Sequence, residues 1–194
     1  MSLEFRALRV PEVILVVPHV HRDRRGFFLE TYHAAKYAGG GIAGPFVQDN
    51  HSRSAGRTLR GLHAQLARPQ GKLVRAVRGR IFDLAVDIRR GSPTFARWAG
   101  AELSADDFRQ LWIPPGFAHG FCVLSAVAEV EYKCTELYAP DDEITIAWND
   151  REIAVDWPLD GEPLLSPRDA EAPPLAELLD LLPVYPAAAV GADA

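Results

Sequence analysis

The feature that most constrains the fold is a succession of short β-rich runs between residues 12 and 148. The runs are bounded by Gly, Pro, Asp or Ser, residues that favour turns. They are EVILVV, GFFLETY, FVQDNHS, LVRAV, IFDLAVDI, QLWIPP, GFCVLS and EVEYKCTEL. This pattern predicts a β-sandwich or barrel. A jelly roll closes or covers the edges of many short strands within one domain, and its open mouth can hold a ligand.

Helical periodicity is confined to short stretches. Brief helical segments are expected after the capping sequence at 104–107 and around residues 33–37. The segment PPLAELLDLLP has leucines at helical spacing between two proline boundaries, which predicts a short helix near the C-terminus. For 194 residues we expect a single domain, 1–194, with its core at about 10–183 and a loose tail at 184–194.

Composition and charge argue against several classes of partner. A net charge of −5 and the lack of a long basic run disfavour nucleic acid and anionic membranes, although a few arginines could still bind an anionic small molecule. No apolar run approaches the roughly 20 residues that span a bilayer, and the start MSLEFRALRV does not resemble a signal peptide. We therefore expect a cytoplasmic protein in which Cys122 and Cys134 are core residues without a disulfide.

Unusual polar residues are densest between residues 48 and 72, in QDNHS, RGLHAQ and Lys72. Alternate residues of a strand share a face, so Gln48 and Asn50 should point together. The same alternation places Arg60 on the face opposite His63.

A metal site is one alternative for these residues, because barrels of this kind often bind a metal through a His-x-His pair, a carboxylate and a further His. Here Gln65 takes the second position after His63, and no glutamate follows at the usual short distance. His19 and His21 do form a His-x-His pair, but three neighbouring arginines oppose a bound cation. We therefore expect neither a metal nor another cofactor.

Without a metal, the residues suit acid–base chemistry. Histidine side chains in general titrate near neutrality, and His63 could accept a proton if a carboxylate such as Asp169 fixes its tautomer. Tyr132 could return a proton from another direction, and Lys72 could stabilise an enolate oxygen as it develops.

Three arginines, at 25, 60 and 168, could each bind phosphate through two parallel donors, although each could equally be a surface charge. Phe27 and Phe28 fall on opposite faces of their strand, so we expect one to be core and assign Phe28 to a pocket wall.

Eight blocks of the sequence, taken in order, resemble the dTDP-4-dehydrorhamnose 3,5-epimerase family over about residues 10–183. They are DRRGFFLE, FVQDNHSRS, LRGLH, QGKLVR, VDIRRGSPTF, QLWIPPGFAHGF, EYKCTELYAP and LSPRD. The resemblance implies an all-β double-stranded β-helix, a metal-free cupin-like jelly roll with short peripheral helices. It also implies a homodimer in which strands near the N-terminus cross to the partner.

The substrate implied by the resemblance is a dTDP-4-keto-6-deoxyhexose, dTDP-4-dehydro-6-deoxy-D-glucose, which is converted to dTDP-4-dehydro-L-rhamnose. C3 and C5 flank the ketone, so loss of either proton gives an enolate, and one site can invert both centres. By resemblance, His63 is the base, Asp169 orients it, Lys72 holds the enolate oxygen and Tyr132 returns a proton from the opposite face.

The remaining implied site residues bind the nucleotide. They are Arg25, Glu30, Gln48, Asp49 and Asn50 at the base and ribose end, Tyr138 stacking on thymine, Arg60, His119 and Arg168 at the diphosphate, and Glu143 as a further binding position.

The sequence departs from the family pattern at three positions. Ala64 stands where an aromatic residue is usual, which predicts a wider pocket wall and leaves the substrate range open. Arg168 replaces a lysine, which keeps the charge but changes its geometry. Cys122 replaces a larger apolar residue.

Three alternatives stay open. The first is an epimerase that inverts C3 or C5 alone, with the same base and dyad. The second is a metal-dependent cupin, either an oxygenase or an isomerase. The third is a catalytically silent module that binds a sugar nucleotide, which would not need a base and an acid together.

Overall fold

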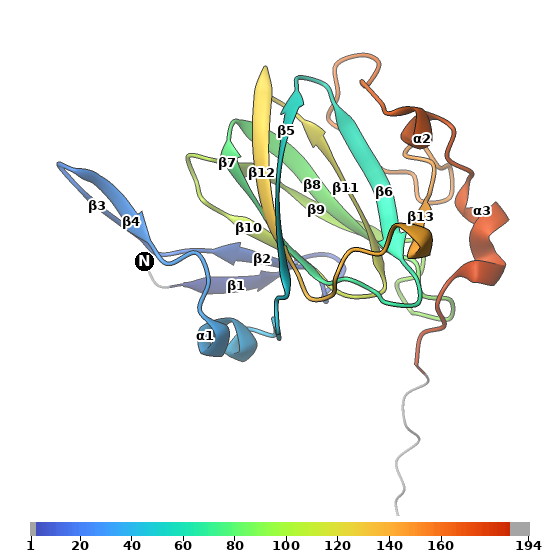
Figure 1. The fold of residues 1–194 in the computed structure, drawn as a ribbon, viewed down its shortest axis with the longest axis horizontal. Coiled ribbons are helices and arrows are strands. Elements are labelled where there is room, and N and C mark those ends of the chain that lie inside the picture. The colour runs from blue at the N-terminus through green and yellow to red at the C-terminus, as the bar shows by residue number, and fades with distance from the viewer. Residues whose placement is uncertain (1–2, 187–194) are drawn as a thin grey trace, which may run out of the picture.

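The structure, a computed structural model, describes residues 3–186 and consists mainly of two antiparallel β-sheets that face each other (Figure 1). The first has the order β1–β2–β10–β7–β12–β5, with bounds Glu4–Ala7, Ile14–Val17, Gln110–Ile113, Lys72–Arg78, Val127–Cys134 and Gln48–Ala55. The second has the order β13–β6–β11–β8–β9, with bounds Glu143–Thr145, Leu59–Gln65, Phe117–Val123, Arg80–Asp87 and Trp98–Ser104. The predicted all-β jelly roll is confirmed.

The core between the sheets is formed by the inward-facing residues of strands from both. Val74, Leu111 and Val130 from the first sheet pack with Ile81 and Leu103 from the second, and all five are almost completely buried. Polar residues on the same inward faces of these strands point into the barrel interior, and alternation along each strand determines which residues these are.

The outer face of the second sheet is covered by the C-terminal part of the chain. Leu62 and Leu84 pack there against Ile146 and Leu175. Ala64 belongs to this same cluster and is 5% exposed. The expectation of a wider pocket wall at Ala64 is therefore wrong, because its side chain lies on the face of β6 opposite to the barrel interior.

A bulge in β6 changes the alternation that the sequence suggested. In the pairing with β11, His63 lies opposite His119 but Arg60 lies opposite Phe121, so three steps along β6 match two along β11. Arg60 and His63 consequently line the same cavity, and the prediction that they point to opposite faces is wrong. Gly61 permits the bulge, with a φ of 125° and no room for a Cβ atom.

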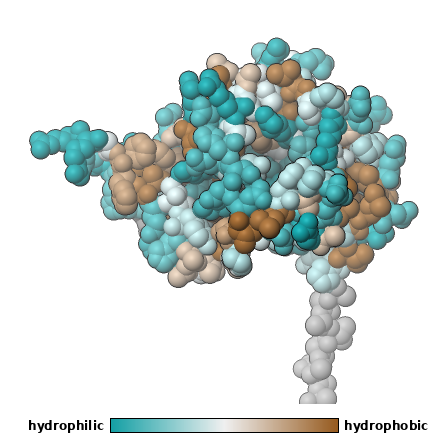
Figure 2. All heavy atoms as spheres, viewed as in Figure 1, coloured by the Kyte–Doolittle hydropathy of each residue, from teal (hydrophilic) through white to brown (hydrophobic). Residues whose placement is uncertain are grey.

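The hairpin of β3 (Val20–Asp23) and β4 (Gly26–Leu29) forms a separate two-stranded sheet that projects from the body, at the left of Figure 1. We call residues 20–30 the arm. Phe27 is 57% exposed and Phe28 72% exposed, so the expectation that one of them is core is wrong: no second sheet lies behind this hairpin. Figure 2 shows a hydrophilic tip on the arm and apolar atoms where it joins the body.

The helices are short, as predicted. Helix α1 (Ala34–Gly39) forms where expected, and the C-terminal segment forms α3 (Leu175–Leu178) continued by the 3-10 helix η2 (Leu179–Leu181). Helix α2 (Pro167–Ala170) precedes them, and the 3-10 helix η1 (Pro140–Asp142) leads into β13. No helix of residues 3–186 is long and apolar enough to cross a membrane.

Two expectations about local structure are corrected. No helix follows Ser104; the segment is a turn between β9 and β10, in which the Ser104 hydroxyl accepts from the Asp106 N–H at 3.1 Å. The first residues of the expected loose tail are held, because the Tyr185 N–H donates to the Arg90 carbonyl at 2.8 Å. Residues 187–194 lie outside the described part of the chain.

Candidate active site

The centre of the candidate site is a hydrogen-bonded pair of His63 and Asp169, which lie 106 positions apart in the sequence. His63 Nε2 is 2.6 Å from Asp169 Oδ1, and the Ser166 hydroxyl donates to Asp169 Oδ2 at 2.7 Å. Ser166 is also the N-cap of α2, where it accepts from the Asp169 N–H at 3.1 Å. Both carboxylate oxygens are thus used, and the carboxylate is held in one orientation.

The environment of this pair favours an ionised Asp169. Burial alone raises the pKa of Asp169, but the hydrogen bonds from His63 and Ser166 outweigh it and leave the pKa below its ordinary value. With Nε2–H donated to the carboxylate, Nδ1 of the neutral ring carries the lone pair. The His63 side chain is 26% exposed, so a substrate can reach the ring.

Lys72 and Tyr132 face the same interior from the opposite sheet. Lys72 shares the inward face of β7 with Val74 and Ala76, and Tyr132 packs against the inner core from β12. Burial lowers the pKa of the Lys72 ammonium, and nearby Cys134, Glu143 and Asp83 act against that shift. The structure records no hydrogen bond from this ammonium to a residue within 3–186.

Tyr132 is protonated at neutral pH. Burial raises the pKa of its hydroxyl, and the neighbouring Cys134 and Glu143 add to this effect. The side chain therefore carries a proton that it can donate.

A second histidine–carboxylate pair lies deeper in the barrel. His119 Nε2 is 2.7 Å from Asp83 Oδ1, and the two residues are 7% and 0% exposed. Burial lowers the pKa of His119 and raises that of Asp83. His119 was assigned to the diphosphate by resemblance, yet it is the cross-strand partner of His63 and lies in the interior.

The two arginines expected at the diphosphate lie nearer the surface. Arg60 and Arg168 line a cavity of about 340 Å³ that also contains His63 and Asp169. Arg60 donates to the Ser54 hydroxyl at 3.1 Å. Arg168 pairs with the Glu143 carboxylate and donates to the Glu143 carbonyl at 2.9 Å. Two guanidinium groups therefore line the cavity that contains the dyad.

The residues expected at the base end form a connected group. Gln48 donates to the Asn50 side chain at 3.0 Å, which confirms that these two alternate residues share a face. The Gln48 side-chain Oε1 also accepts from the Tyr138 N–H at 2.8 Å, and the Tyr138 side chain is 48% exposed.

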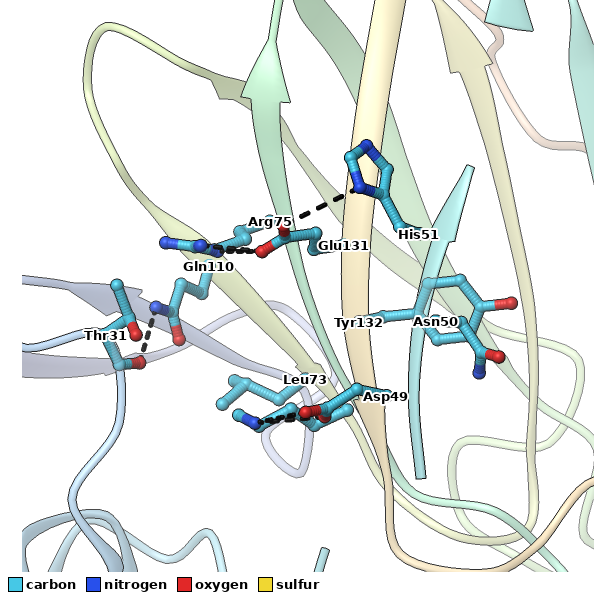
Figure 3. Close-up of a pocket in the computed structure, with 10 residues that line it drawn as sticks. Thr31, Asp49, Asn50, His51, Leu73, Arg75, Gln110, Glu131 and Tyr132 are labelled. Atoms are coloured by element: carbon cyan, nitrogen blue, oxygen red, sulfur yellow. Dashed lines mark hydrogen bonds and ion pairs between the residues drawn. The ribbon is translucent and has the colours of Figure 1, made fainter. Parts of the chain in front are cut away.

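Asp49 does not join this group. Alternation turns its side chain to the outer face of β5, where it pairs with Lys133 at 3.0 Å. Figure 3 shows the outer-face cavity of about 380 Å³, with Glu131 and Arg75 on the side of β12 away from the Tyr132 ring and Asn50. Glu131 accepts from Arg75 at 2.6 Å there.

The expected site residues on the arm are also remote from the dyad. Arg25 pairs with Asp23 at 2.6 Å, and Glu30 pairs with Lys36 at 2.8 Å. Phe28 projects into solvent. Within one protomer the arm is thus not part of the cavity that contains His63.

Sequence reasoning missed several residues that support the site. Ser166 bonds to Asp169 and Asp83 bonds to His119, whereas Gln65 and Gln70 bind the segment that carries Tyr138. The aspartate at the third position of the apolar run IFDLAVDI was an available signal, as was the Ser-Pro helix start before Asp169. Among residues 3–186, no group of three or more His, Cys, Asp or Glu side chains could hold a metal ion.

The comparison with a family model supports the resemblance. The model, described as dTDP-4-dehydrorhamnose 3,5-epimerase, matches residues 7–177. The protein of that name from Pseudomonas aeruginosa is 54% identical over 171 residues, which are 88% of this chain and 94% of the relative. The one from Salmonella typhimurium is 51% identical over 172 residues, with 88% and 94% covered.

Solved structures agree with this assignment. A dTDP-6-deoxy-D-glucose-3,5-epimerase from Legionella pneumophila, in complex with dTDP-4-keto-L-rhamnose, has a TM-score of 0.93 and 48% identity, and covers 96% of this chain and 100% of its own. A 3'-monoepimerase from Streptomyces bikiniensis, in complex with dTDP-quinovose, has a TM-score of 0.87 and 35% identity, with 93% of each chain covered. The chain therefore belongs to the dTDP-4-dehydrorhamnose 3,5-epimerase family and is an isomerase.

Proposed function

We propose that His63 is the base in the 3,5-epimerisation of dTDP-4-dehydro-6-deoxy-D-glucose, which gives dTDP-4-dehydro-L-rhamnose. The observation that carries this assignment is the His63–Asp169 pair, at 2.6 Å, inside a barrel that also contains Lys72 and Tyr132. Asp169 keeps the proton on Nε2, so Nδ1 can take a proton from a carbon beside the ketone.

The other groups complete the exchange. As the C–H bond breaks, its electron pair forms an enolate, and the charge on the C4 oxygen is stabilised by the Lys72 ammonium. Tyr132 then donates its hydroxyl proton to the carbon from the opposite face, which inverts the centre. The tyrosinate recovers a proton from water, and His63 returns the abstracted one to solvent, so the enzyme is unchanged.

The nucleotide extends from the interior to the surface in this proposal. Arg60 and Arg168 bind the diphosphate through paired N–H groups, and Arg168 exchanges its contact with Glu143 for phosphate oxygens. Gln48, Asn50 and Tyr138 bind the base and ribose end, where an exposed aromatic ring offers a stacking face.

The protein functions as a homodimer in this proposal. Arg25, Phe28 and Glu30 extend from the body on the arm, and within one protomer they do not contact the His63 cavity (Figure 1). Two exposed phenylalanines on a projecting hairpin favour burial against another chain. We place each arm against the partner, where its residues complete the partner's nucleotide site.

The protein is located in the cytoplasm in this proposal, because a reducing compartment suits the two buried free cysteines.

Proton NMR in heavy water tests the chemistry. With the dTDP-4-keto-6-deoxyglucose substrate and a coupled reductase, we expect deuterium at both C3 and C5 and a rhamnose-configured product. Deuterium at one carbon only would identify a single-centre epimerase. His63→Ala should show no exchange while its nucleotide affinity stays near that of the wild type. Tyr132→Phe should exchange protons but invert poorly.

A further inference from the structure

Three of the four glutamines in the chain bind one short segment, residues 136–139, which carries Tyr138. The segment follows β12 and belongs to no strand or helix. Its main-chain groups are bonded by side chains: the carbonyls of Glu136 and Leu137 and the N–H groups of Tyr138 and Ala139. We call these three side chains, Gln48, Gln65 and Gln70, the glutamine clamp.

Gln65 makes the largest number of these bonds. Its Nε2 donates to the Leu137 carbonyl at 3.2 Å and to the Arg68 carbonyl at 2.8 Å, and its Oε1 accepts from the Ala139 N–H at 2.9 Å. The residue is 5% exposed and stands two positions after His63 on β6. One strand thus carries both the proposed base and the main support of the segment.

Gln70 holds the start of the segment, and Gln48 binds at Tyr138 itself. Gln70 is 8% exposed and donates to the Glu136 carbonyl at 2.8 Å. Gln48 accepts from the Tyr138 N–H at 2.8 Å. Just beyond the segment, the Asp142 carboxylate accepts from the N–H groups of Ala67 and Arg68, each at 2.8 Å, so residues 65–70 and 136–142 form one connected unit.

The clamp fixes the backbone while the side chains it carries stay available. Leu137 is 53% exposed and Tyr138 is 48% exposed. An aromatic ring on a fixed backbone loses less conformational freedom when a ligand stacks on it, which is the usual benefit of preorganisation. Glutamine suits this role because its amide has both a donor and an acceptor and can satisfy a carbonyl and an N–H together.

We propose that Gln65 and Gln70 are positioning residues for nucleotide recognition, which act by holding Tyr138 in the orientation that stacks on the base. Because Gln65 and His63 share β6, the clamp also sets the separation between the base subsite and the proton-transfer site. This inference rests on the proposed function, in which Tyr138 contacts the nucleotide.

The test compares Gln65→Met and Gln70→Met with the wild type. Methionine has a similar length but cannot donate to a carbonyl. We measure the affinity for dTDP by calorimetry, and KM and kcat with dTDP-4-keto-6-deoxyglucose. Loss of oriented stacking should raise both Kd and KM about 10-fold for Gln65→Met and less for Gln70→Met, with kcat changed less than about 2-fold.

Two comparisons separate positioning from a general loss of stability. Trp157→Phe is the matched control, because it also removes a side-chain N–H bond to a backbone carbonyl, that of Trp148 at 2.8 Å, in a loop without Tyr138. Its Kd and KM should stay within about 2-fold of wild type. In a Tyr138→Ala background, adding Gln65→Met should raise Kd by less than about 2-fold, because the residue acts through Tyr138.

Other outcomes overturn the inference. Unchanged Kd and KM in Gln65→Met would do so, as would a 10-fold effect that persists without Tyr138, or a loss of kcat with KM intact. If Gln65→Met does not fold, Gln65→Glu decides: it keeps the acceptor for Ala139 and replaces the donors by a carboxylate oxygen that repels the Leu137 and Arg68 carbonyls, so the same rise in Kd and KM is expected. The wild-type protein tests the proposed function separately: absence of turnover and of dTDP binding there refutes that function, whatever the variants do.

Discussion

Lys72 and Asp83 show how single buried groups influence each other across the barrel. Burial opposes the charge of the Lys72 ammonium, and the nearby carboxyl groups counteract that effect. Asp83 is fully buried, and its Oδ2 has no hydrogen-bond partner among the described residues, whereas its Oδ1 bonds to His119. In its ionised form Asp83 is therefore a counter-charge for the cation that is proposed to hold the enolate.

Asp83→Asn should lower the upper pH limit of activity. The amide still accepts a hydrogen bond from His119 but carries no charge, so the pKa of Lys72 falls further. The charged form is present only below that pKa, so kcat/KM should begin to decline at a lower pH than in the wild type. The measurement is kcat/KM against pH, which reports groups of the free enzyme.

Asp87→Asn is the control for that pH profile. It alters a buried aspartate that bonds to Arg89, Ser92 and Thr94 at the end of β8, outside the cavity with His63. Its alkaline limb should match that of the wild type. An unshifted limb in Asp83→Asn would mean that Asp83 carries no charge while Lys72 acts.

At the scale of one element, β6 determines the geometry of the site. Its bulge turns Arg60 and His63 into the same cavity, and its far end supplies Gln65 to the glutamine clamp. The bulge depends on Gly61. A Cβ atom there would lie 2.6 Å from the Cα of Gly120 and 2.7 Å from the carbonyl oxygen of His119.

Gly61→Ala should destabilise the protein strongly. The φ of 125° is unfavourable for alanine, and the new methyl group meets backbone atoms that cannot move alone. We expect the free energy of unfolding, measured with urea, to fall by about 2 kcal/mol or more. Any folded fraction should have a reduced kcat because His63 is displaced. Gly39→Ala, with no atom within 4 Å of the added carbon, should change stability by less than about 0.5 kcal/mol.

Individual elements also show what the sequence could predict. The strands were predictable because they depend on features of neighbouring residues, namely the turn residues at their ends and their β-branched content. Gln48 and Asn50 share a face, as predicted, because β5 is regular. The bulge in β6 was not predicted, because strict alternation assumes that no residue is inserted. The mistaken pocket wall at Ala64 came from the family resemblance instead, since alternation already places Ala64 on the face opposite His63.

At the scale of the whole molecule, sequence reasoning could not predict contacts between residues that are far apart along the chain. His63 and Asp169 are 106 positions apart, and only the family resemblance paired them. Asp83 and the clamp glutamines depend on contacts between distant segments, which no local pattern encodes. Conversely, the resemblance indicated Arg25 and Glu30, strand alternation indicated Phe28, and one protomer does not bring these residues to the dyad. These three residues are the reason to consider a second copy of the chain.

Mixing two inactive variants tests whether the arm serves the partner. His63→Ala has an intact arm but no base, and the double variant Arg25→Ala/Phe28→Ala has a base but an impaired arm. If each arm completes the partner's site, a mixed dimer contains one whole site, and an equimolar mixture that has exchanged subunits should recover about a quarter of wild-type activity. If the arm serves its own protomer, no mixed species has a complete site and activity stays near that of the arm variant alone. Light scattering on each variant supplies the control, since a dimer has twice the chain mass of 21.3 kDa. Arm variants that remain dimeric would locate the defect in nucleotide binding, whereas monomeric ones would show that the arm also holds the two protomers together.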